Sequence, residues 1–335
     1  MNPPTRLKGI FIVAPDWGPH LYGEEERAEL GRHIAWVAPP RSAAEIRGEL
    51  GLLREVEVIF AGWGTAVMDE AFMAAAPRLR AVFHAGGTVR YFATEAFWNR
   101  DVVVCSGAAI NALPVVEYAL AAILFSLRDG WFHARRAHRD GAFPPRRPMP
   151  GSYGTTVGLV SLGAIARLLC ERLRPFDVRL VAHDPFAGAA DAARLGVELV
   201  SLEEVFARSE VVSLHAPLLP ATENMIRGHH FAAMKPGATF INTARGAIVN
   251  EPEMIAVLER RPDLQAVLDV TWPEPPAAGS PLYRLENVVL TPHIAGTTPR
   301  EARRIGRAMV EDFHRWLRGE PLRHAISREQ FARMA

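Results

Sequence analysis

Three short segments in the last third of the chain place a chemically useful side chain directly after an apolar, strand-like run. They are INTARG (241–246), LDVTWPEP (268–275) and LTPHIAG (290–296), which carry Arg245, Glu274 and His293. An arginine can hold a carboxylate through two parallel hydrogen bonds. A histidine paired with a carboxylate can accept and donate a proton near neutral pH. The trio therefore predicts chemistry on a hydroxy acid or an oxo acid, provided that the chain also binds a hydride acceptor.

Composition restricts the class of protein. The chain has 335 residues, of which 49% are hydrophobic and 22% charged, which is a globular composition long enough for two domains. Its formal net charge of +1 argues against a nucleic-acid partner. Cys105 and Cys170 lie far apart in apolar stretches, which favours buried free thiols over a disulfide or a metal pair. We expect no signal peptide, no membrane span and no membrane partner, hence a cytoplasmic protein.

Short apolar runs alternate with helical patterns along most of the chain. The first series of expected strands covers residues 9–14, 56–63, 80–86 and 102–106, and the second covers 156–162, 178–184, 210–216, 238–244, 264–270 and 287–293. Near-continuous Val, Leu and Ile strands between helices are typical of parallel sheets covered on both faces. We therefore predict an α/β protein of two Rossmann-like or flavodoxin-like domains, with mainly parallel sheets and a cleft between them.

Three segments indicate how the domains divide. Residues 113–130 are apolar nearly all round, as in a helix buried between layers or domains. Residues 134–151 are rich in proline and arginine and are expected to form a connection. The expected helix at 299–319 carries an apolar stripe that could dock onto the first domain, namely Ile305, Met309, Phe313 and Trp316. The predicted domains are a discontinuous substrate domain of residues 1–107 and 299–335, and a cofactor domain of residues 108–298.

A glycine at a strand-to-helix junction suggests a dinucleotide site. The fingerprint G-x-G-x-x-G would align with Ser161, Gly163 and Ala166, and the middle glycine would let a pyrophosphate approach the helix N-terminus. Ser161 departs from the pattern, and any turn with one glycine would match equally well. Asp184 ends the next expected strand, where a carboxylate can bind ribose hydroxyls and repel a ribose phosphate, or can simply begin an Asp-Pro turn. NAD, rather than NADP, is the expected cofactor.

The order of these motifs resembles a known family. NTARG, LDV…EP and TPHIAG after a G-x-G-type turn, together with EVVSLHAPLLPAT (210–222) and MKPGATFINTARGAIVN (234–250), resemble the D-isomer specific 2-hydroxyacid dehydrogenases. The resemblance covers about residues 80–317 and is strongest over 210–296, whereas residues 1–79 share only the pattern of strands and helices. It implies an NAD-dependent enzyme that interconverts a D-2-hydroxy acid and its 2-oxo acid, and a homodimer.

The resemblance also implies roles for particular residues. Arg245 would bind the substrate carboxylate, His293 would be the acid–base, and Glu274 would orient the imidazole and favour its protonated form. Residues implied in the cofactor cleft are Gly163, Ala164, Ile165, Asp184, Ala216, Pro217, Thr222, Thr243, Asp269 and Gly296, with Asp269 at the nicotinamide end. Residues expected at the substrate are the backbone amides of Gly86, Gly87 and Thr88, and Trp63, which follows a first-domain strand and otherwise would pack at a domain interface.

Several alternatives stay open. In the loop HAGGTVRYF, Arg90 stands where the family has aspartate, and it is either a second anion contact or, more in keeping with most arginines, a structural residue. For His215 we expect a structural or cofactor-edge role. His229 and His230 are adjacent, so we expect that they cannot both face one site, and without zinc spacing no metal is predicted. The rival functions are oxidation of an unusual substrate, such as phosphite or a sugar acid, and an NAD-sensing, corepressor-like binding protein with little turnover.

Overall fold

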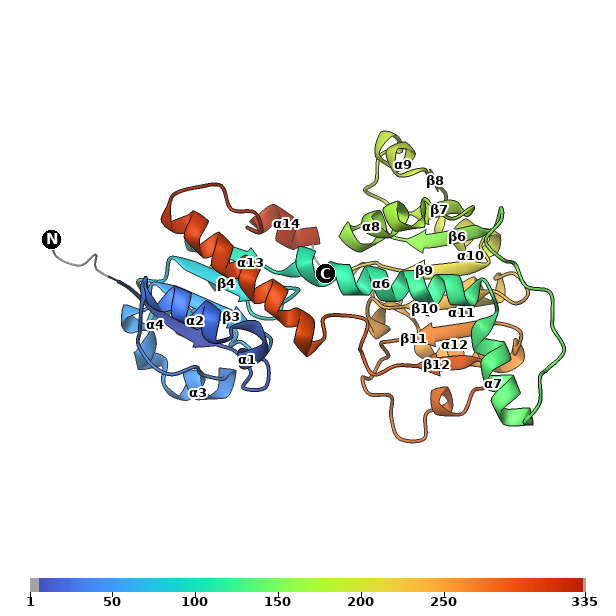
Figure 1. The fold of residues 1–335 in the computed structure, drawn as a ribbon, viewed down its shortest axis with the longest axis horizontal. Coiled ribbons are helices and arrows are strands. Elements are labelled where there is room, and N and C mark those ends of the chain that lie inside the picture. The colour runs from blue at the N-terminus through green and yellow to red at the C-terminus, as the bar shows by residue number, and fades with distance from the viewer. Residues whose placement is uncertain (1–5, 334–335) are drawn as a thin grey trace. The chain divides into compact units, whose positions relative to one another are not determined.

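The computed structural model describes residues 6–333 and divides into two compact units. One unit takes in the residues up to 112 and those from 297 onward, and the other is Leu113–Gly296. Each unit has its own parallel sheet with helices, so the predicted α/β class is correct (Figure 1). Residues 1–5 and 334–335, which belong to the predicted substrate domain, lie outside the described residues.

The first unit contains a five-stranded parallel sheet in the order β2-β1-β3-β4-β5. Its strands are β1 (Leu7–Ile12), β2 (Ile34–Trp36), β3 (Val58–Gly62), β4 (Ala81–Ala85) and β5 (Val103–Ser106). The order is that of flavodoxin-like folds, in which ligands bind beyond the carboxyl ends of the strands. Two of the predicted substrate residues, Trp63 and Gly86, directly follow β3 and β4 at those ends.

Both faces of this sheet are buried, because successive side chains of a strand point to opposite sides. Ile59 and Val82 belong to the core on one face, and Phe60 and Phe83 to the core on the other. The first face is covered by α3 (Ala43–Gly48), η1 (Leu50–Glu55), α4 (Glu70–Ala75), α5 (Glu95–Trp98) and Phe331 of α14 (Arg328–Arg333). The second face is covered by α1 (Gly18–Leu21), α2 (Glu24–Gly31) and α13 (Pro299–Leu317).

The apolar stripe of α13 is what attaches the C-terminal part of the chain to this sheet. Ile305, Met309 and Phe313 are fully buried in the core that includes Phe83 of β4, and Figure 1 shows the helix lying over that strand. The helix begins at a proline, which has no amide hydrogen to leave unpaired at this position. The predicted docking of this helix onto the strands of the N-terminal part is therefore confirmed.

The second unit contains a seven-stranded sheet in the order β12-β11-β10-β9-β6-β7-β8. Its strands are β6 (Thr156–Val160), β7 (Arg179–His183), β8 (Val197–Leu199), β9 (Val211–Leu214), β10 (Thr239–Asn242), β11 (Gln265–Leu268) and β12 (Val288–Leu290). All neighbouring pairs are parallel. After β6 the chain adds β7 and β8 on one side of that strand, and then adds β9, β10, β11 and β12 on the other side. This reversal is the topological switch point where dinucleotides bind in doubly wound sheets.

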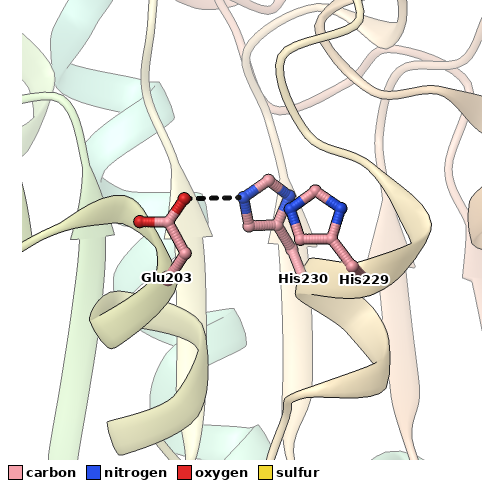
Figure 2. Close-up of side chains that lie close together, drawn as sticks. All are labelled: Glu203, His229 and His230. Carbon is pink, nitrogen blue, oxygen red and sulfur yellow. Dashed lines mark ion pairs between the residues drawn. The ribbon is translucent and has the colours of Figure 1, made fainter.

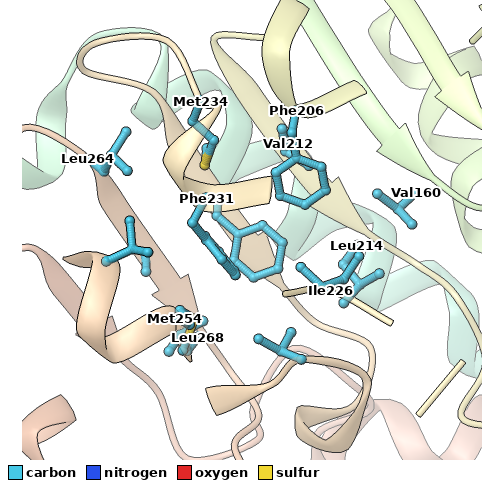
Figure 3. Close-up of a cluster of buried hydrophobic side chains, with 14 of the residues drawn as sticks. Val160, Phe206, Val212, Leu214, Ile226, Phe231, Met234, Met254, Leu264 and Leu268 are labelled. Carbon is cyan, nitrogen blue, oxygen red and sulfur yellow. The ribbon is translucent and has the colours of Figure 1, made fainter. Parts of the chain in front are cut away.

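Helices cover both faces of the second sheet, which explains why its strands read as continuous apolar runs. On one face, Leu159, Ile241 and Val267 meet α6 (Ala108–Ser126), α8 (Ala164–Leu173) and α9 (Ala189–Leu195). On the other, Phe240 and Leu268 meet α10 (Leu202–Arg208), α11 (Gly228–Ala232) and α12 (Glu251–Arg260), in the core drawn in Figure 3. The sheet is thus a rigid support whose strand ends hold the predicted site residues.

The expected elements need three corrections. The edge strands β2 and β8 were not predicted, because three residues are too few to show a repeating pattern of apolar side chains. The expected connection at 134–151 is helical in its first part, since α7 runs from Gly130 to Asp140 and ends at Gly141 with φ +61°. The apolar helix predicted from residue 113 begins at Ala108 and contains Pro114.

The helix α6 is both long and apolar. Among the described residues it is the one helix whose length and composition would allow it to cross a membrane. This finding departs from the expectation of no membrane-spanning segment in length and composition alone, and core helices of globular proteins share both properties. Val116, Ala119 and Ile123 of α6 are buried in a core with the sheet, whereas Phe125 is exposed, so its expected burial is only partial. Both cysteines are buried and free, as predicted.

Candidate functional site

Six strands of the second sheet end shortly before predicted site residues. In the order of the sheet these are β12 before His293, β11 before Asp269, β10 before Thr243 and Arg245, β9 before Ala216, β6 before Gly163, and β7 before Asp184. The strands are parallel and adjacent, so all of these residues lie along the same edge of one sheet. The residues predicted to bind the nucleotide follow β6 and β7, and those predicted to transfer a proton or bind an anion follow β10, β11 and β12.

Arg245 lies in the tight loop between β10 and the short helix η2 (Gly246–Ile248). Asn242 folds this loop, since its side-chain oxygen accepts from the Ala244 amide at 2.9 Å and its nitrogen donates to the Arg245 carbonyl at 3.2 Å. Burial lowers the pKa of the Arg245 guanidinium, with Glu274 opposing that shift. No carboxylate of the described residues lies within ion-pair distance of this guanidinium. A desolvated cation without a counter-ion is suited to receive an anionic ligand.

Gly246 brings the Arg245 loop against the next loop of the site. A Cβ at this glycine would lie 2.0 Å from the carbonyl carbon of Thr271. Only glycine permits this approach of two backbones. The Arg245 loop is therefore held against the segment that contains Glu274. Neither Asn242 nor Gly246 was singled out from the sequence, although both lie in the INTARG motif.

His293 and Glu274 form the predicted pair. Nδ1 of His293 lies 2.6 Å from Oε1 of Glu274, so the carboxylate accepts from Nδ1 and Nε2 is left to face a ligand. The two side chains are 47% and 42% exposed, which leaves both accessible. His293 has φ +54°, in the left-handed region that only a few per cent of non-glycine residues adopt. Such strain is concentrated at functional sites, where the surroundings hold it in place.

Asp269 is the group that holds the His293 loop. The residue is only 2% exposed. Its carboxylate accepts hydrogen bonds from the amides of Ile294 at 2.8 Å and Ala295 at 2.9 Å. It also accepts from Thr291 Oγ1 at 2.6 Å, and its backbone carbonyl accepts from the His293 amide at 3.0 Å. Asp269 thus acts on His293 through the backbone; its contact with nicotinamide stays a prediction. Thr291 was not identified from the sequence, because a threonine before Pro-His has no distinctive pattern.

The turn after β6 leaves backbone amides available at the start of α8. Gly163 is the N-cap residue, is exposed, and makes no side-chain cap. A Cβ on it would have Ser161 Oγ at 4.0 Å as its nearest neighbour, so the space above the glycine is open. Ala164 and Ile165 follow as the first residues of the helix. Free amides and the positive end of the helix dipole favour an anion such as a pyrophosphate here.

Asp184 forms the turn that was the simpler alternative for it. Oδ1 accepts from the amides of Phe186 at 2.8 Å and Ala187 at 3.0 Å. Oδ2 accepts from the Leu162 amide at 2.7 Å and from the Ser161 hydroxyl at 3.1 Å. The carboxylate therefore ties the end of β7 to the glycine turn after β6, which fixes its position beside a nucleotide site.

Two buried polar atoms lack partners at the ends of β9 and β10. They are Nδ1 of His215 and Oγ1 of Thr243, in residues that are 9% and 8% exposed. Burial lowers the pKa of His215 to about 4, so its ring is neutral and holds the Ser213 hydroxyl at 2.9 Å. Unpaired buried polar atoms are costly, and a polar ligand at this edge would satisfy them. Together with the open space at Gly163, they fit a bound dinucleotide.

The remaining cofactor-cleft residues shape loops at the same edge. Ala216 is buried and leads into a turn in which Thr222 Oγ1 accepts from the Leu219 amide at 2.8 Å and donates to the Pro217 carbonyl at 2.5 Å. Gly296 follows the amide of Ala295 that binds Asp269. These residues support backbone positions and present no charge of their own.

In the first unit, the predicted substrate loop is held in place by contacts with the ends of β4 and β5. A Cβ on Gly86 would lie 2.4 Å from Nε2 of His84, and the Ser106 hydroxyl donates to the Gly87 carbonyl. The Gly86 amide donates to the His84 carbonyl at 2.9 Å, so the prediction of an anion-binding amide is wrong at this residue. The amides of Gly87 and Thr88 have no partner among residues 6–333 and are available to an anion.

Trp63 and Arg90 have identifiable structural contacts. The Trp63 ring lies 4.5 Å from that of Trp17 and packs on the core of the first unit. The Arg90 guanidinium donates to the carbonyls of Phe331 and Ala332, at 2.8 and 2.9 Å, and lies over the Phe331 ring. The structural alternative for Arg90 therefore has direct support, because its guanidinium holds α14.

Glu203, His229 and His230 form the one group of potential metal ligands in the part of the chain that the structure describes (Figure 2). Their ligand atoms lie within 4.8 Å of one another, so the expectation that the adjacent histidines cannot face one site was wrong. However, Nδ1 of His230 accepts from the Arg227 amide at 3.0 Å. In the neutral ring the proton is then on Nε2, which faces Glu203 at 4.0 Å. A metal needs a lone pair at that nitrogen, so we assign none here.

Comparison with known proteins identifies the family. Residues 121–295 match the model of the D-isomer specific 2-hydroxyacid dehydrogenase, NAD binding domain. The chain is 38% identical over 253 residues to a (S)-sulfolactate dehydrogenase of Chromohalobacter salexigens, covering 75% of this chain and 81% of that protein. It is 33% identical over 280 residues to a D-3-phosphoglycerate dehydrogenase of Mycobacterium bovis, covering 83% of this chain but only 52% of that relative.

A solved structure gives the same result for the whole fold. The apo D-mandelate dehydrogenase of Rhodotorula graminis superposes with a TM-score of 0.80 at 25% identity, covering 97% of this chain and 98% of that one. A doubly wound sheet whose strand ends carry an arginine without a carboxylate partner, a histidine–glutamate pair and a glycine turn is consistent with a dinucleotide-dependent oxidoreductase. The chain belongs to the D-isomer specific 2-hydroxyacid dehydrogenases, an NAD-dependent family.

Proposed function

We propose that this protein interconverts a D-2-hydroxy acid and its 2-oxo acid with NAD as the hydride carrier. The observation that carries the proposal is that a half-buried arginine without a carboxylate partner lies at the same end of the sheet as a histidine–glutamate pair. The family supplies the reaction class, and the chain's own contacts support the roles proposed for these residues. A histidine held in a strained conformation beside a carboxylate favours proton transfer and gives no support to the NAD-sensing alternative.

The roles follow from the chemistry of each group. Arg245 binds the substrate carboxylate through two parallel hydrogen bonds and thereby fixes the carbon that reacts. Nε2 of His293 takes the hydroxyl proton as the C2–H bond breaks, and returns it in the reverse direction. Glu274 accepts from Nδ1 and stabilises the imidazolium that results. NAD, when bound, accepts the hydride released from C2.

The cofactor assignment rests on the strand ends of β6, β7, β9 and β10. We place the pyrophosphate at the amides of Gly163, Ala164 and Ile165, and the adenosine ribose at Asp184. His215 and Thr243 offer their unpartnered atoms to the same ligand. The charge of Asp184 would repel a ribose phosphate, so we propose NAD over NADP. If Asp184→Ala leaves the ratio of the NADH and NADPH dissociation constants unchanged, the ribose assignment is wrong.

We assign the substrate domain to the first unit and the cofactor domain to the second. The amides of Gly87 and Thr88 would bind the substrate carboxylate, and Trp63 would limit the size of its side chain. Because one relative is a sulfolactate dehydrogenase, the substrate panel should include 2-hydroxy acids that carry a second acidic group. Unusual substrates, such as phosphite or a sugar acid, belong in the same panel.

We also propose a cytoplasmic homodimer without a nucleic-acid or membrane partner. The near-zero net charge and the two buried free thiols support the compartment and the absence of a polyanion partner. Phe125 of α6, and Phe143 and Tyr153 of the segment between α7 and β6, are exposed, and a second copy could cover them. Sedimentation of wild type and Phe143→Ser would test the dimer.

The direct test is the initial rate of NADH consumption across a panel of 2-oxo acids. His293→Ala should lower kcat by roughly 100- to 10,000-fold, the usual contribution of a general acid–base. Arg245→Ala should lower kcat/KM by a similar factor, since it removes two charged hydrogen bonds. His138→Ala and Arg260→Ala, both at exposed positions of the second unit, are matched controls and should change little. Tight NADH binding without turnover on any acid would instead favour the NAD-sensing function.

A further inference from the structure

The carboxylate proposed to bind the ribose already has a full set of donors. A carboxylate offers about four lone-pair positions. Asp184 receives four hydrogen bonds, from the amides of Leu162, Phe186 and Ala187 and from the hydroxyl of Ser161. A ribose hydroxyl can therefore bind this carboxylate only if one of these donors leaves or shares its position.

Of the four donors, only the Ser161 hydroxyl is free to move. The three amides belong to the turn after β7 and to the turn after β6, so moving them would break backbone structure. The Ser161 hydroxyl can rotate about one side-chain bond. Its distance of 3.1 Å from Oδ2 is also the longest of the four, against 2.7 to 3.0 Å for the amides.

Ser161 also occupies its position at a cost to the backbone. Its φ is +77°, in the region where a residue with a Cβ is strained and where the dinucleotide fingerprint has its first glycine. The bond to Asp184 compensates part of that strain in the protein without cofactor. Binding of the ribose removes this compensation, so the serine opposes cofactor binding both by occupying an acceptor and by stabilising the free protein.

We propose that Ser161 is a determinant of cofactor affinity and selectivity, acting as an internal competitor of the adenosine ribose for the carboxylate of Asp184. This inference rests on the proposed NAD function. A glycine at this position would leave one lone pair of Asp184 open to the ribose. The serine weakens binding of NADH more than binding of NADPH, because a ribose phosphate is repelled by Asp184 whether or not the hydroxyl is present.

The test is titration of NADH and NADPH by fluorescence, with wild type, Ser161→Ala and Ser161→Gly. Ser161→Ala removes the hydroxyl but keeps the strained φ, whereas Ser161→Gly removes both. We expect Ser161→Ala to lower the NADH dissociation constant about three- to tenfold, the factor that the net free energy of one ordinary hydrogen bond supplies, and to change that of NADPH less than twofold. Ser161→Gly should tighten NADH at least as much. Thermal unfolding of each variant establishes that it is folded.

Ser280→Ala is the matched control. Ser280 lies in the same unit, outside the proposed cofactor residues. Its hydroxyl accepts a hydrogen bond from the Leu282 amide. This variant should leave both dissociation constants unchanged. An NADH constant for Ser161→Ala that is within twofold of wild type, or higher, would overturn the inference, as would an equal gain for NADPH. Failure of the wild-type protein to bind NADH at all would overturn the proposed function and the inference together.

Discussion

Arg245 and His293 are each held in a state that costs free energy before any substrate binds. The guanidinium is desolvated without a counter-ion, and the histidine backbone is in a left-handed conformation. The residues that stabilise these states are Asn242, Gly246 and Asp269, which bind backbone rather than ligand. Positioning of this kind is what hydride and proton transfer require, because the reacting atoms must be oriented within a fraction of an ångström.

Gly246→Ala tests whether the approach of the two loops positions Arg245. The added methyl would overlap the Thr271 carbonyl, so we expect a loss of about 1–3 kcal/mol in the free energy of unfolding and a fall of roughly 100-fold in kcat/KM. Urea unfolding and steady-state kinetics measure the two effects. Gly48→Ala, within the helix α3, has no atom within 4 Å of its added Cβ and should not lower stability or activity. Wild-type kinetics for Gly246→Ala would show that the loop contact does not position the arginine.

At the level of elements, the long strands and the docking helix α13 were predictable because their periodicity extends over many residues. The short strands β2 and β8 were not, since three residues give no period. Residues 134–151 were assigned to a connection on their proline and arginine content, yet the arginines of the first part lie on the helix α7. At the site, Arg245, Glu274 and His293 follow recognisable motifs, whereas Thr291 and Asn242 are polar residues without distinctive spacing. Their roles depend on which loops the fold brings together.

The docking of α13 onto α2 predicts a pH-dependent contribution to stability. The carboxylate of Glu29 in α2 accepts hydrogen bonds from Arg307 and, at 2.7 Å, from His314. The pKa of Glu29 is lowered from 4.5 to about 2, and the largest cause is the hydrogen bond from Arg307. Glu29→Gln should lower the free energy of unfolding by about 1–2 kcal/mol at pH 7.

The sign of the pH effect follows from the lowered pKa. The contribution of a carboxylate with a depressed native pKa is complete above its unfolded value of 4.5 and is lost as the pH falls toward about 2. The difference between wild type and Glu29→Gln in urea unfolding should therefore shrink across that window. Glu25→Gln, on the exposed face of the same helix, should cost little at any pH. An unchanged stability for Glu29→Gln at pH 7 would contradict the assigned docking contact.

For the whole molecule, each unit buries a neutral histidine beside its proposed site. Burial lowers the pKa of His84 to about 3 in the first unit and that of His215 to about 4 in the second. Below pH 6.5 the unfolded chain binds protons at these positions and the native protein does not. Each unit should therefore lose about 1.4 kcal/mol of stability per histidine for every pH unit below 6.5. Urea unfolding at pH 7.5, 6.5 and 5.5 measures this, and equal stability at all three values would contradict it.

Transfer of deuterium from NADH tests the central claim most directly. Wild-type protein is incubated with NADH deuterated at either face of C4 and with a panel of 2-oxo acids, and the product is analysed by mass spectrometry and chiral chromatography. We predict that one of the two labelled cofactors delivers deuterium to C2 of a D-2-hydroxy acid, and that His293→Ala slows this transfer by at least about 100-fold. A protein that binds NADH but transfers no deuterium to any acid of the panel would contradict the proposed function.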